Sequence, residues 1–161
     1  MYYPGYSKKE LNQQLYYACE YSEMKRVKKL IQLGADVNAM QTYDNDSLWL
    51  GLSMNEGWES FAYPIHMAAL NKDIEVLNAL IEFGANPLLQ SDWKDEPLKW
   101  AVTANNFEVI KLLVDIYKNN PLHCNCDGMT PLQFARINAN KTKNYKIYKY
   151  LLFKSKYFEE D

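Results

Sequence analysis

The sequence predicts an all-α protein, a solenoid of about four helix-turn-helix units. The first observation is a recurring proline, because Pro64, Pro97 and Pro131 stand 33 and 34 residues apart in similar surroundings. The second is a set of apolar residues spaced by three and four, which is typical of one buried face of a helix. Since a single pair of helices cannot bury its apolar face alone, neighbouring units are expected to stack.

The apolar register begins at a small alanine in each unit. Counted from Ala18, Ala68 and Ala101, apolar residues follow at the sixth, ninth, twelfth and thirteenth positions. They are Met24, Val27, Leu30 and Ile31, then Ile74, Leu77, Leu80 and Ile81, then Phe107, Ile110, Leu113 and Val114. A fourth copy, counted from Ala135, places Tyr145, Tyr148, Leu151 and Leu152 on the buried face once about four extra residues within 139–144 are allowed.

Helix boundaries are marked by residues with a clear conformational role. Proline at the first helical position removes a backbone N–H that would be unpaired there, so we expect first helices to begin at Pro64, Pro97 and Pro131. The stretch Ser7-Lys-Lys-Glu10 is a capping box at the start of the first unit. Gly34 and Gly84 follow two second helices, where a left-handed residue commonly ends the helix.

These residues resemble the ankyrin-repeat family. Its unit is a turn, a first helix opened by Thr-Pro-Leu-His-x-Ala and a longer second helix ending in Gly-Ala-Asp. Thr130-Pro-Leu and Pro64-Ile-His match the opening, and Gly34-Ala-Asp matches the end. The resemblance covers residues 10–156 of a single domain, 1–161, with units at about 8–39, 62–90, 91–122 and 125–156. It implies binding to another protein through a concave face rather than catalysis.

One connection is much longer than the others. Ala18 and Ala68 lie 50 residues apart, about 17 more than one period, and the extra length falls at 40–62. In the family this connection is a β-hairpin finger beside the concave face. Loops of this length are usually functional or disordered, and the aromatic residues here argue against disorder, so we expect one long finger. Its acidic residues are interpreted as solvated charge, with a catalytic carboxylate pair as the alternative; they are Asp44, Asp46, Glu56 and Glu59.

The last two units depart from the family pattern at their ends. Unit three lacks the closing Gly-Ala, and we expect Asn119 or Asn120 to be the left-handed residue there. The last helix of unit four carries many lysines, which we interpret as the solvated face of a terminal unit. Nucleic-acid contact through these lysines and the interleaved tyrosines is the alternative.

Two groups of residues invite a chemical interpretation. His66 stands at the family's histidine position, where the imidazole hydrogen-bonds backbone in neighbouring turns, and no triad partner is suitably spaced. The stretch His123-Cys-Asn-Cys126 resembles part of a metal site, but zinc needs about four ligands and Cys19 lies far away in the first unit. We favour a loop without metal, and a metal- or redox-responsive sensor or small enzyme using 40–62 and Cys124/Cys126 is the alternative.

Net charge, apolar runs and the number of cysteines disfavour several classes of function. A formal charge of −2 disfavours general nucleic-acid binding, and no apolar run reaches the roughly 20 residues of a membrane span. Three cysteines do not suggest a disulfide framework, so a reducing, cytoplasmic setting is expected. We expect no enzyme activity, no cofactor and no metal, and a monomer that binds a protein partner as inhibitor, immunity factor, effector or scaffold.

The partner-binding surface is expected to combine fingers, turn tips and first-helix residues. Tryptophan and tyrosine are frequent hot spots, so affinity should concentrate in a few aromatics. For Trp93, packing on the adjacent finger is the open alternative, and Trp100 is expected to pack inside. The candidate partner-binding residues are Tyr43, Trp49, Trp58, Asp92, Trp93, Lys94, Glu20, Tyr21, Asn71 and Thr103, on the finger, the tip at 91–95 and the first helices, with a second tip at 125–129.

Overall fold

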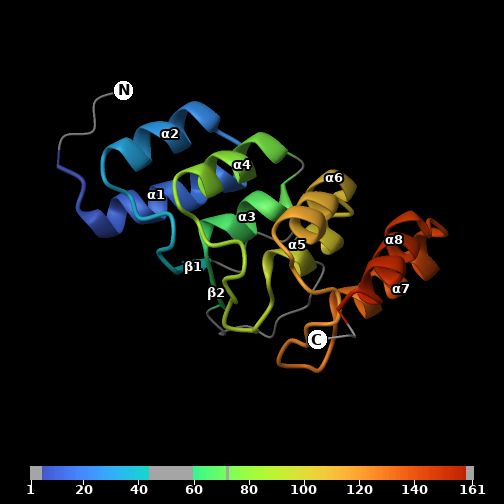
Figure 1. Ribbon diagram of the computed structural model, residues 1–161. Helices are drawn as coiled ribbons and strands as arrows, with labels where there is room; N and C mark the ends of the chain where they lie inside the picture. The colour runs from blue at the N-terminus through green and yellow to red at the C-terminus, as the bar shows by residue number, and fades with distance from the viewer. Residues whose placement is uncertain (1–4, 44–59, 72, 159–161) are drawn as a thin grey trace. The chain divides into compact units, whose positions relative to one another are not determined.

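The computed structural model describes residues 5–43, 60–71 and 73–158, and this part of the chain contains eight α-helices and two short strands (Figure 1). The chain forms two compact units, Met1–Asn86 and Pro87–Asp161. Each unit contains two helix-turn-helix repeats, as the all-α repeat architecture predicts.

The N-terminal unit pairs α1 with α2 and α3 with α4, joined by a two-stranded antiparallel hairpin. The first helices α1 and α3 pack together, as do the second helices α2 and α4. The hairpin register places Gln41 opposite Ala62 and Tyr43 opposite Ser60. The elements are α1 Lys8–Glu20, α2 Met24–Gln32, β1 Gln41–Tyr43, β2 Ser60–Ala62, α3 Pro64–Leu70 and α4 Ile74–Glu82.

The C-terminal unit has the same plan, with one irregular second helix. Helix α5 packs against α7, and α7 against α8. The second helix of the third repeat continues from α6 into a π-helical turn, η1. The elements are α5 Pro97–Thr103, α6 Phe107–Lys111, η1 Leu112–Ile116, α7 Pro131–Thr142 and α8 Lys146–Ser155.

The predicted helix starts are confirmed. Helices α3, α5 and α7 begin at Pro64, Pro97 and Pro131. At α1, the Ser7 N–H donates to Glu10 Oε2 at 2.7 Å and the Glu10 N–H donates to Ser7 Oγ at 3.3 Å, which is the predicted capping box. These caps satisfy N–H groups that have no partner inside a helix.

The repeated alanines lie in the core, where their small side chains allow the paired helices to approach. Ala18, Ala68 and Ala101 are fully buried and Ala135 nearly so. The leucines expected on the second helices are fully buried as well: Leu30, Leu77, Leu80 and Leu113. Trp100 is also buried, which confirms that it packs inside.

The end of the third repeat corrects one prediction. Gly34 and Gly84 have positive φ as expected, but in the third repeat the left-handed residue is Lys118 (φ 59°), not Asn119 or Asn120. The π-helical turn supplies the physical reason. It adds one residue to the helix end, so the left-handed position moves one residue past Tyr117, which aligns with the glycines.

The last helix corrects a second prediction. Tyr145 is 38% exposed, Tyr148 is half-buried and Leu152 is 42% exposed, whereas Ile147 and Leu151 form the buried face of α8. Tyr145 lies outside because it precedes α8 as its N-cap residue, and its hydroxyl donates to Asn140 Oδ1 on α7 at 3.2 Å. Helix α7 also runs on to Thr142, so the extra residues of this repeat lengthen its first helix.

The predicted long finger begins and ends in the paired strands β1 and β2. Trp49, Trp58 and the acidic residues Asp44, Asp46, Glu56 and Glu59 lie outside the described residues. Across the described ranges, no helix has both the length and the apolar character that crossing a bilayer requires.

Candidate functional site

The best-defined surface element is the turn tip at 91–95, which precedes α5. The Ser91 N–H donates to the Asp95 carbonyl oxygen at 3.0 Å, and the Lys94 N–H donates to the Ser91 carbonyl oxygen at 2.9 Å. Lys94 has a positive φ of 57°, a conformation that closes the turn but is uncommon for residues other than glycine.

The second tip, at 125–129, repeats this pattern one period later. The Asn125 N–H donates to the Met129 carbonyl oxygen at 3.1 Å, and the Gly128 N–H donates to the Asn125 carbonyl oxygen at 3.0 Å. Gly128 takes the left-handed position that Lys94 occupies in the first tip. The buried Asn125 side chain also accepts from the N–H groups of Asp127 and Met129, both at 3.0 Å.

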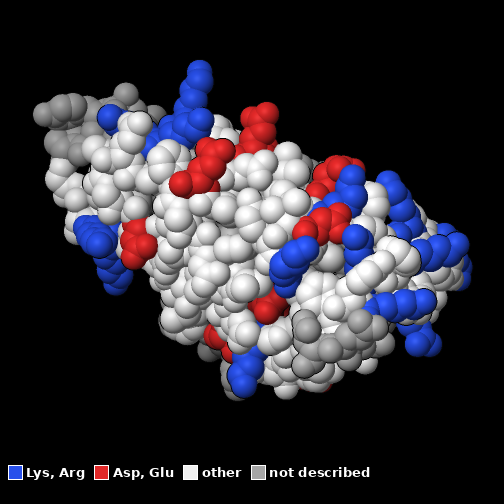
Figure 2. Space-filling view, in the orientation of Figure 1, with Lys and Arg blue, Asp and Glu red and all other residues white. Residues whose placement is uncertain are grey.

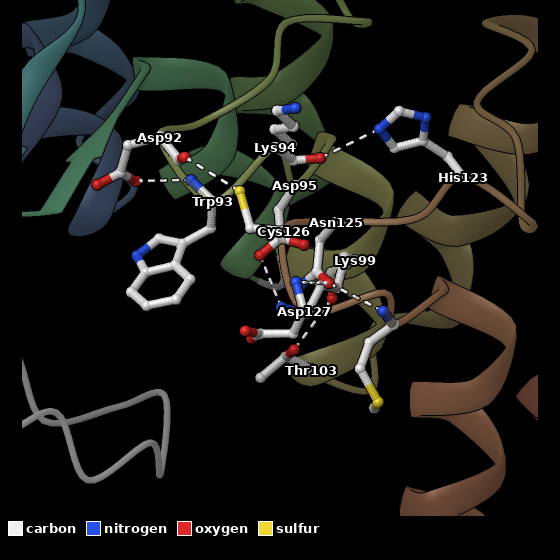
Figure 3. A network of polar contacts seen from close by, with 11 residues as sticks. Asp92, Trp93, Lys94, Asp95, Lys99, Thr103, His123, Asn125, Cys126 and Asp127 are labelled. Carbon is white, nitrogen blue, oxygen red and sulfur yellow. Dashed lines mark hydrogen bonds and ion pairs between the residues drawn. The ribbon is translucent and has the colours of Figure 1, made fainter.

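The two tips are hydrogen-bonded to each other (Figure 3). The Cys126 N–H donates to the Trp93 carbonyl oxygen at 2.9 Å. His123 Nε2 lies 3.1 Å from the Lys94 carbonyl oxygen and must donate to it, since a carbonyl oxygen only accepts. The Cys126 thiol donates to the Asp92 carbonyl oxygen at 3.7 Å. These three contacts join the first tip to residues 123–126.

A buried ion pair supports the tips from below. Lys99 Nζ lies 2.6 Å from Asp95 Oδ2, and both side chains are about nine-tenths buried. Asp95 also accepts a hydrogen bond from the Asn125 side chain, and Lys99 Nζ lies 4.8 Å from the Phe134 ring centroid. Burial raises the pKa of Asp95, although its contacts with Lys99 and Asn125 act in the opposite direction.

A second buried carboxylate lies beside the imidazole that joins the tips. Glu96 Oε1 is 3.8 Å from His123 Nδ1, and the Glu96 side chain is 10% exposed. Burial raises the pKa of Glu96, while the charge of His123 and a hydrogen bond from the Asn120 backbone lower it by less. Burial therefore disfavours the charged form of both carboxylates beneath the two tips, those of Asp95 and Glu96. These two residues, with Lys99 and Asn125, are called the polar base of the tips.

Lys99 occupies the repeat position at which His66 and Gln133 stand in the neighbouring units. His66 Nδ1 accepts the Tyr63 N–H at 3.2 Å, so this histidine bonds the backbone at the start of its own helix; the expected contact with a neighbouring turn stays a prediction. Gln133 Oε1 accepts the Thr130 N–H at 2.8 Å in the same way. A lysine amine cannot accept, and Lys99 binds the Asp95 carboxylate instead.

The sequence interpretation missed this polar base. Asp95, Lys99 and Asn125 were not among the candidate residues, yet they hold the two tips together. The available signal was Lys99 itself, because a donor-only side chain at a position where the family has an acceptor requires a nearby anion.

The candidate residues of the tip differ in exposure. Asp92 and Lys94 are exposed, whereas Trp93 is half-buried. Figure 3 shows the Trp93 indole pointing away from Asp95 and Lys99, while its backbone takes part in the contacts between the tips. The tip thus carries one anionic, one aromatic and one cationic residue in succession, and in Figure 3 the Trp93 and Lys94 side chains point in opposite directions.

The first-helix candidates belong to other elements than the tip, and several have structural contacts. In the N-terminal unit, Asn71 Nδ2 donates to the Glu20 carbonyl oxygen at 2.7 Å, and Tyr21 is 66% exposed. In the C-terminal unit, Thr103 Oγ1 donates to the Lys99 carbonyl oxygen at 3.0 Å. Tyr43 ends β1, and Trp49 and Trp58 lie outside the described residues.

The cysteines are free in the described part of the chain. Cys19 is buried in α1, Cys126 is exposed on the second tip, and Cys124 is exposed just before it. Among the described residues, no group of three or more His, Cys, Asp or Glu side chains is arranged to hold a metal ion.

Comparison with known proteins agrees with this architecture. Residues 65–160, more than half of the chain, match the family model of ankyrin repeats in three copies. The chain belongs to the ankyrin-repeat family. Ankyrin repeats are generally protein–protein interaction modules, and the family is typically non-enzymatic. The pair α1 and α2 lies before the matched residues and adds a further repeat of the same form.

The curated relatives are larger ankyrin-repeat proteins. Ankyrin repeat and SOCS box protein 11 from Homo sapiens and from Pongo abelii is 34% identical over 77 residues, covering 48% of this chain and 18% of the relative. The Mus musculus protein of the same name is 31% identical over 104 residues, covering 65% of this chain and 27% of the relative. The chain thus spans about a fifth to a quarter of the length of these relatives.

Proposed function

We propose that this ankyrin-repeat chain binds another protein through the tip at 91–95, the adjoining tip at 125–129 and the exposed ends of its first helices. It acts by occupying a surface of that partner, as an inhibitor, immunity factor, effector or scaffold, and not as an enzyme. The supporting observation is the hydrogen bond from the Cys126 N–H to the Trp93 carbonyl oxygen, at 2.9 Å, which joins the two tips.

Hydrogen bonds between the tips favour binding for a physical reason. A loop that is already ordered loses little conformational entropy when a partner binds, so more of the contact free energy appears as affinity. The tip carries Asp92, Trp93 and Lys94 in succession, and an aromatic residue beside charges of both signs is typical of a binding hot spot and its polar rim. The exposed Tyr21 offers a second aromatic contact in the N-terminal unit.

Site-directed photo-crosslinking in the producing cell tests the proposal. A photoreactive amino acid replaces Asp92, Lys94 or Tyr21 in turn, and exposed Lys28 on α2 is the control position. We expect the same partner protein to crosslink from the tip and not from position 28. A partner that crosslinks equally from position 28, or no crosslinked protein from the tip, would contradict the proposed surface.

A second variant separates surface contact from folding. The double substitution Asp92→Ser and Lys94→Gly removes both charged side chains, while serine can still accept the Trp93 N–H and glycine accepts the positive φ. The crosslink from exposed position 127, on the second tip of the same unit, should weaken about tenfold if the first tip contributes roughly 1.4 kcal/mol. An unchanged circular dichroism spectrum confirms that the fold is intact.

A further inference from the structure

The charge of the last repeat is strongly one-sided. Of the 18 Lys and Arg in the chain, seven lie within 131–158, a range without Asp or Glu, and three acidic residues follow this range directly at 159–161. Figure 2 shows these basic side chains, in blue, over α7 and α8. The seven are Arg136, Lys141, Lys143, Lys146, Lys149, Lys154 and Lys156.

The exposed face of α8 combines these charges with apolar side chains. At 100° per residue, Lys146, Lys149 and Phe153 fall within one quarter-turn of the helix, and Lys156 and Tyr157 lie in the turn directly after its last residue, Ser155. Phe153 is 55% and Tyr157 is 63% exposed, although residues of these types are usually covered. The opposite face is buried through Ile147, Leu151 and Ser155.

Contacts with the third repeat fix the border of this face. Lys154 Nζ lies 2.6 Å from Asp115 Oδ1, and Lys146 Nζ lies 4.0 Å from the Phe107 ring centroid. Phe153 and Tyr157 pack edge to face, with ring centroids 5.7 Å apart. By contrast, Lys149 and Lys156 form no ion pair with any other described residue. Two rings thus lie beside two lysines that have no acidic partner among the described residues.

The range of electrostatic forces indicates the kind of partner. Outside 131–158 the chain carries eleven basic against 20 acidic residues, so an extended polyanion such as nucleic acid or an anionic membrane is repelled by the rest of the molecule. A short acidic segment interacts only with charges within a Debye length of about 8–10 Å. It therefore interacts chiefly with the charged residues on and beside α8, where the seven basic residues of 131–158 outnumber Asp115 and the acidic residues 159–161.

We propose that the exposed face of α8 and the turn after it, formed by Lys146, Lys149, Phe153, Lys156 and Tyr157, is a docking surface for a short acidic segment of a partner protein that also carries apolar side chains. The carboxylates of the segment pair with the lysines, and its apolar side chains cover Phe153 and Tyr157. This surface is independent of the tips at 91–95 and 125–129.

Binding of synthetic peptides to the full chain tests this proposal. The probe is a fluorescein-labelled peptide of alternating Glu-Glu and Leu-Phe pairs, and a matched peptide has Ser-Gly in place of Leu-Phe. Fluorescence anisotropy should show tighter binding of the Leu-Phe peptide. The double variant Phe153→Ser and Tyr157→Ser should remove that preference, because both residues are exposed and their replacement leaves the core intact. Equal affinities for the two peptides in the wild type would overturn the apolar part of the proposal.

Charge reversal provides the second arm with a matched control. The double variant Lys149→Glu and Lys156→Glu should bind the Leu-Phe peptide about tenfold or more weakly than wild type, equivalent to roughly 1.4 kcal/mol. The control double variant Lys25→Glu and Lys28→Glu changes the net charge by the same amount, at exposed positions of α2. Its affinity for the Leu-Phe peptide should stay within about twofold of wild type, well under about 1.4 kcal/mol. Equal losses in both double variants would show only a net-charge effect. Tighter binding, at equal salt, of a single-stranded oligonucleotide or of phosphatidylserine-containing vesicles would likewise overturn the proposal.

Discussion

Lys99 Nζ and Asp95 Oδ2 lie 2.6 Å apart in a salt bridge whose two side chains are about nine-tenths buried. Asp95 belongs to the tip at 91–95, and Lys99 belongs to α5 and contacts Phe134 on α7. The pair therefore links the tip to two helices of the C-terminal unit. A buried pair of this kind is costly to break, since removal of one partner leaves an uncompensated charge.

We expect Asp95→Ala to lower the free energy of unfolding by about 3 kcal/mol, because Lys99 would remain buried without its counter-ion. Urea denaturation measures the change. Adding Lys99→Met should recover most of the loss, since the unpaired charge is then removed. The control Asp127→Ala, at an exposed position of the other tip, should stay within about 0.5 kcal/mol of wild type. Failure of Lys99→Met to rescue Asp95→Ala would show that the loss has another cause.

Glu96 gives the protein a predictable pH dependence. Burial raises the pKa of Glu96 above its ordinary value of 4.5, so the folded state ionises this carboxyl less readily than the unfolded state. Its contribution to stability is therefore fully present below the unfolded pKa and decreases as pH rises through the folded pKa. Glu96→Gln should be close to wild type at pH 4 and become more stable relative to wild type as the pH rises to 7.

Urea denaturation at several pH values tests the sign of this effect, with Glu108→Gln as the control. The Glu108 side chain is 65% exposed on α6, and we expect this change to leave the pH profile of stability nearly unchanged. A Glu96→Gln protein that loses stability relative to wild type between pH 4 and pH 7 would contradict the assignment of burial as the dominant cause.

The three thiols should differ sharply in reactivity. Burial raises the pKa of Cys19, and only the thiolate reacts, whereas Cys124 and Cys126 are exposed. A disulfide reagent that releases a coloured thiolate should therefore titrate two thiols promptly and the third only on unfolding. The double variant Cys124→Ser and Cys126→Ser should show no prompt reaction in native buffer. Prompt reaction of that variant would show that α1 opens readily.

Repetition made most of the architecture predictable from sequence. Three prolines in one register placed the starts of α3, α5 and α7, because each residue has one dominant role that recurs in every unit. Prediction was less successful where a unit changes length. The π-helical turn η1 and the extension of α7 depend on tertiary packing, and no residue type marks them, so the left-handed Lys118 and the exposed Tyr145 were missed.

The candidate site was predicted less completely for a related reason. Sequence position indicated that the tip at 91–95 is a surface element, and Asp92 and Lys94 are indeed exposed. Contacts between residues 29 to 34 positions apart, such as His123 with Lys94 and Cys126 with Asp92, cannot be derived from local pattern. The hydrogen-bonding capacity of the side chains would have helped to predict the site. At one repeat position Lys99 can only donate, whereas His66 and Gln133 can also accept.

The left-handed residues at the helix ends allow a matched pair of substitutions. Gly84 has φ +93° and open space where a Cβ would lie, so Gly84→Ala adds only conformational strain. That strain is about 1–2 kcal/mol, and the reduced entropy of the unfolded chain offsets about 0.5–1 kcal/mol of it. We expect a net loss of about 1 kcal/mol. Lys118 has φ 59°, so Lys118→Gly relieves the same kind of strain and should stabilise the protein by about 0.5 kcal/mol.

Lys118→Ala separates strain from side-chain contacts in this pair. Lys118 Nζ donates to the Asp115 carbonyl oxygen at 2.7 Å, and both substitutions remove that exposed hydrogen bond. Alanine keeps the strain of a positive φ, so Lys118→Ala should be no more stable than wild type, whereas Lys118→Gly should unfold at a higher temperature. Thermal unfolding of wild type, Lys118→Gly and Lys118→Ala measures these differences in stability. A stabilised alanine variant would mean that the lysine side chain, and not the backbone, limits stability where the π-helical turn ends.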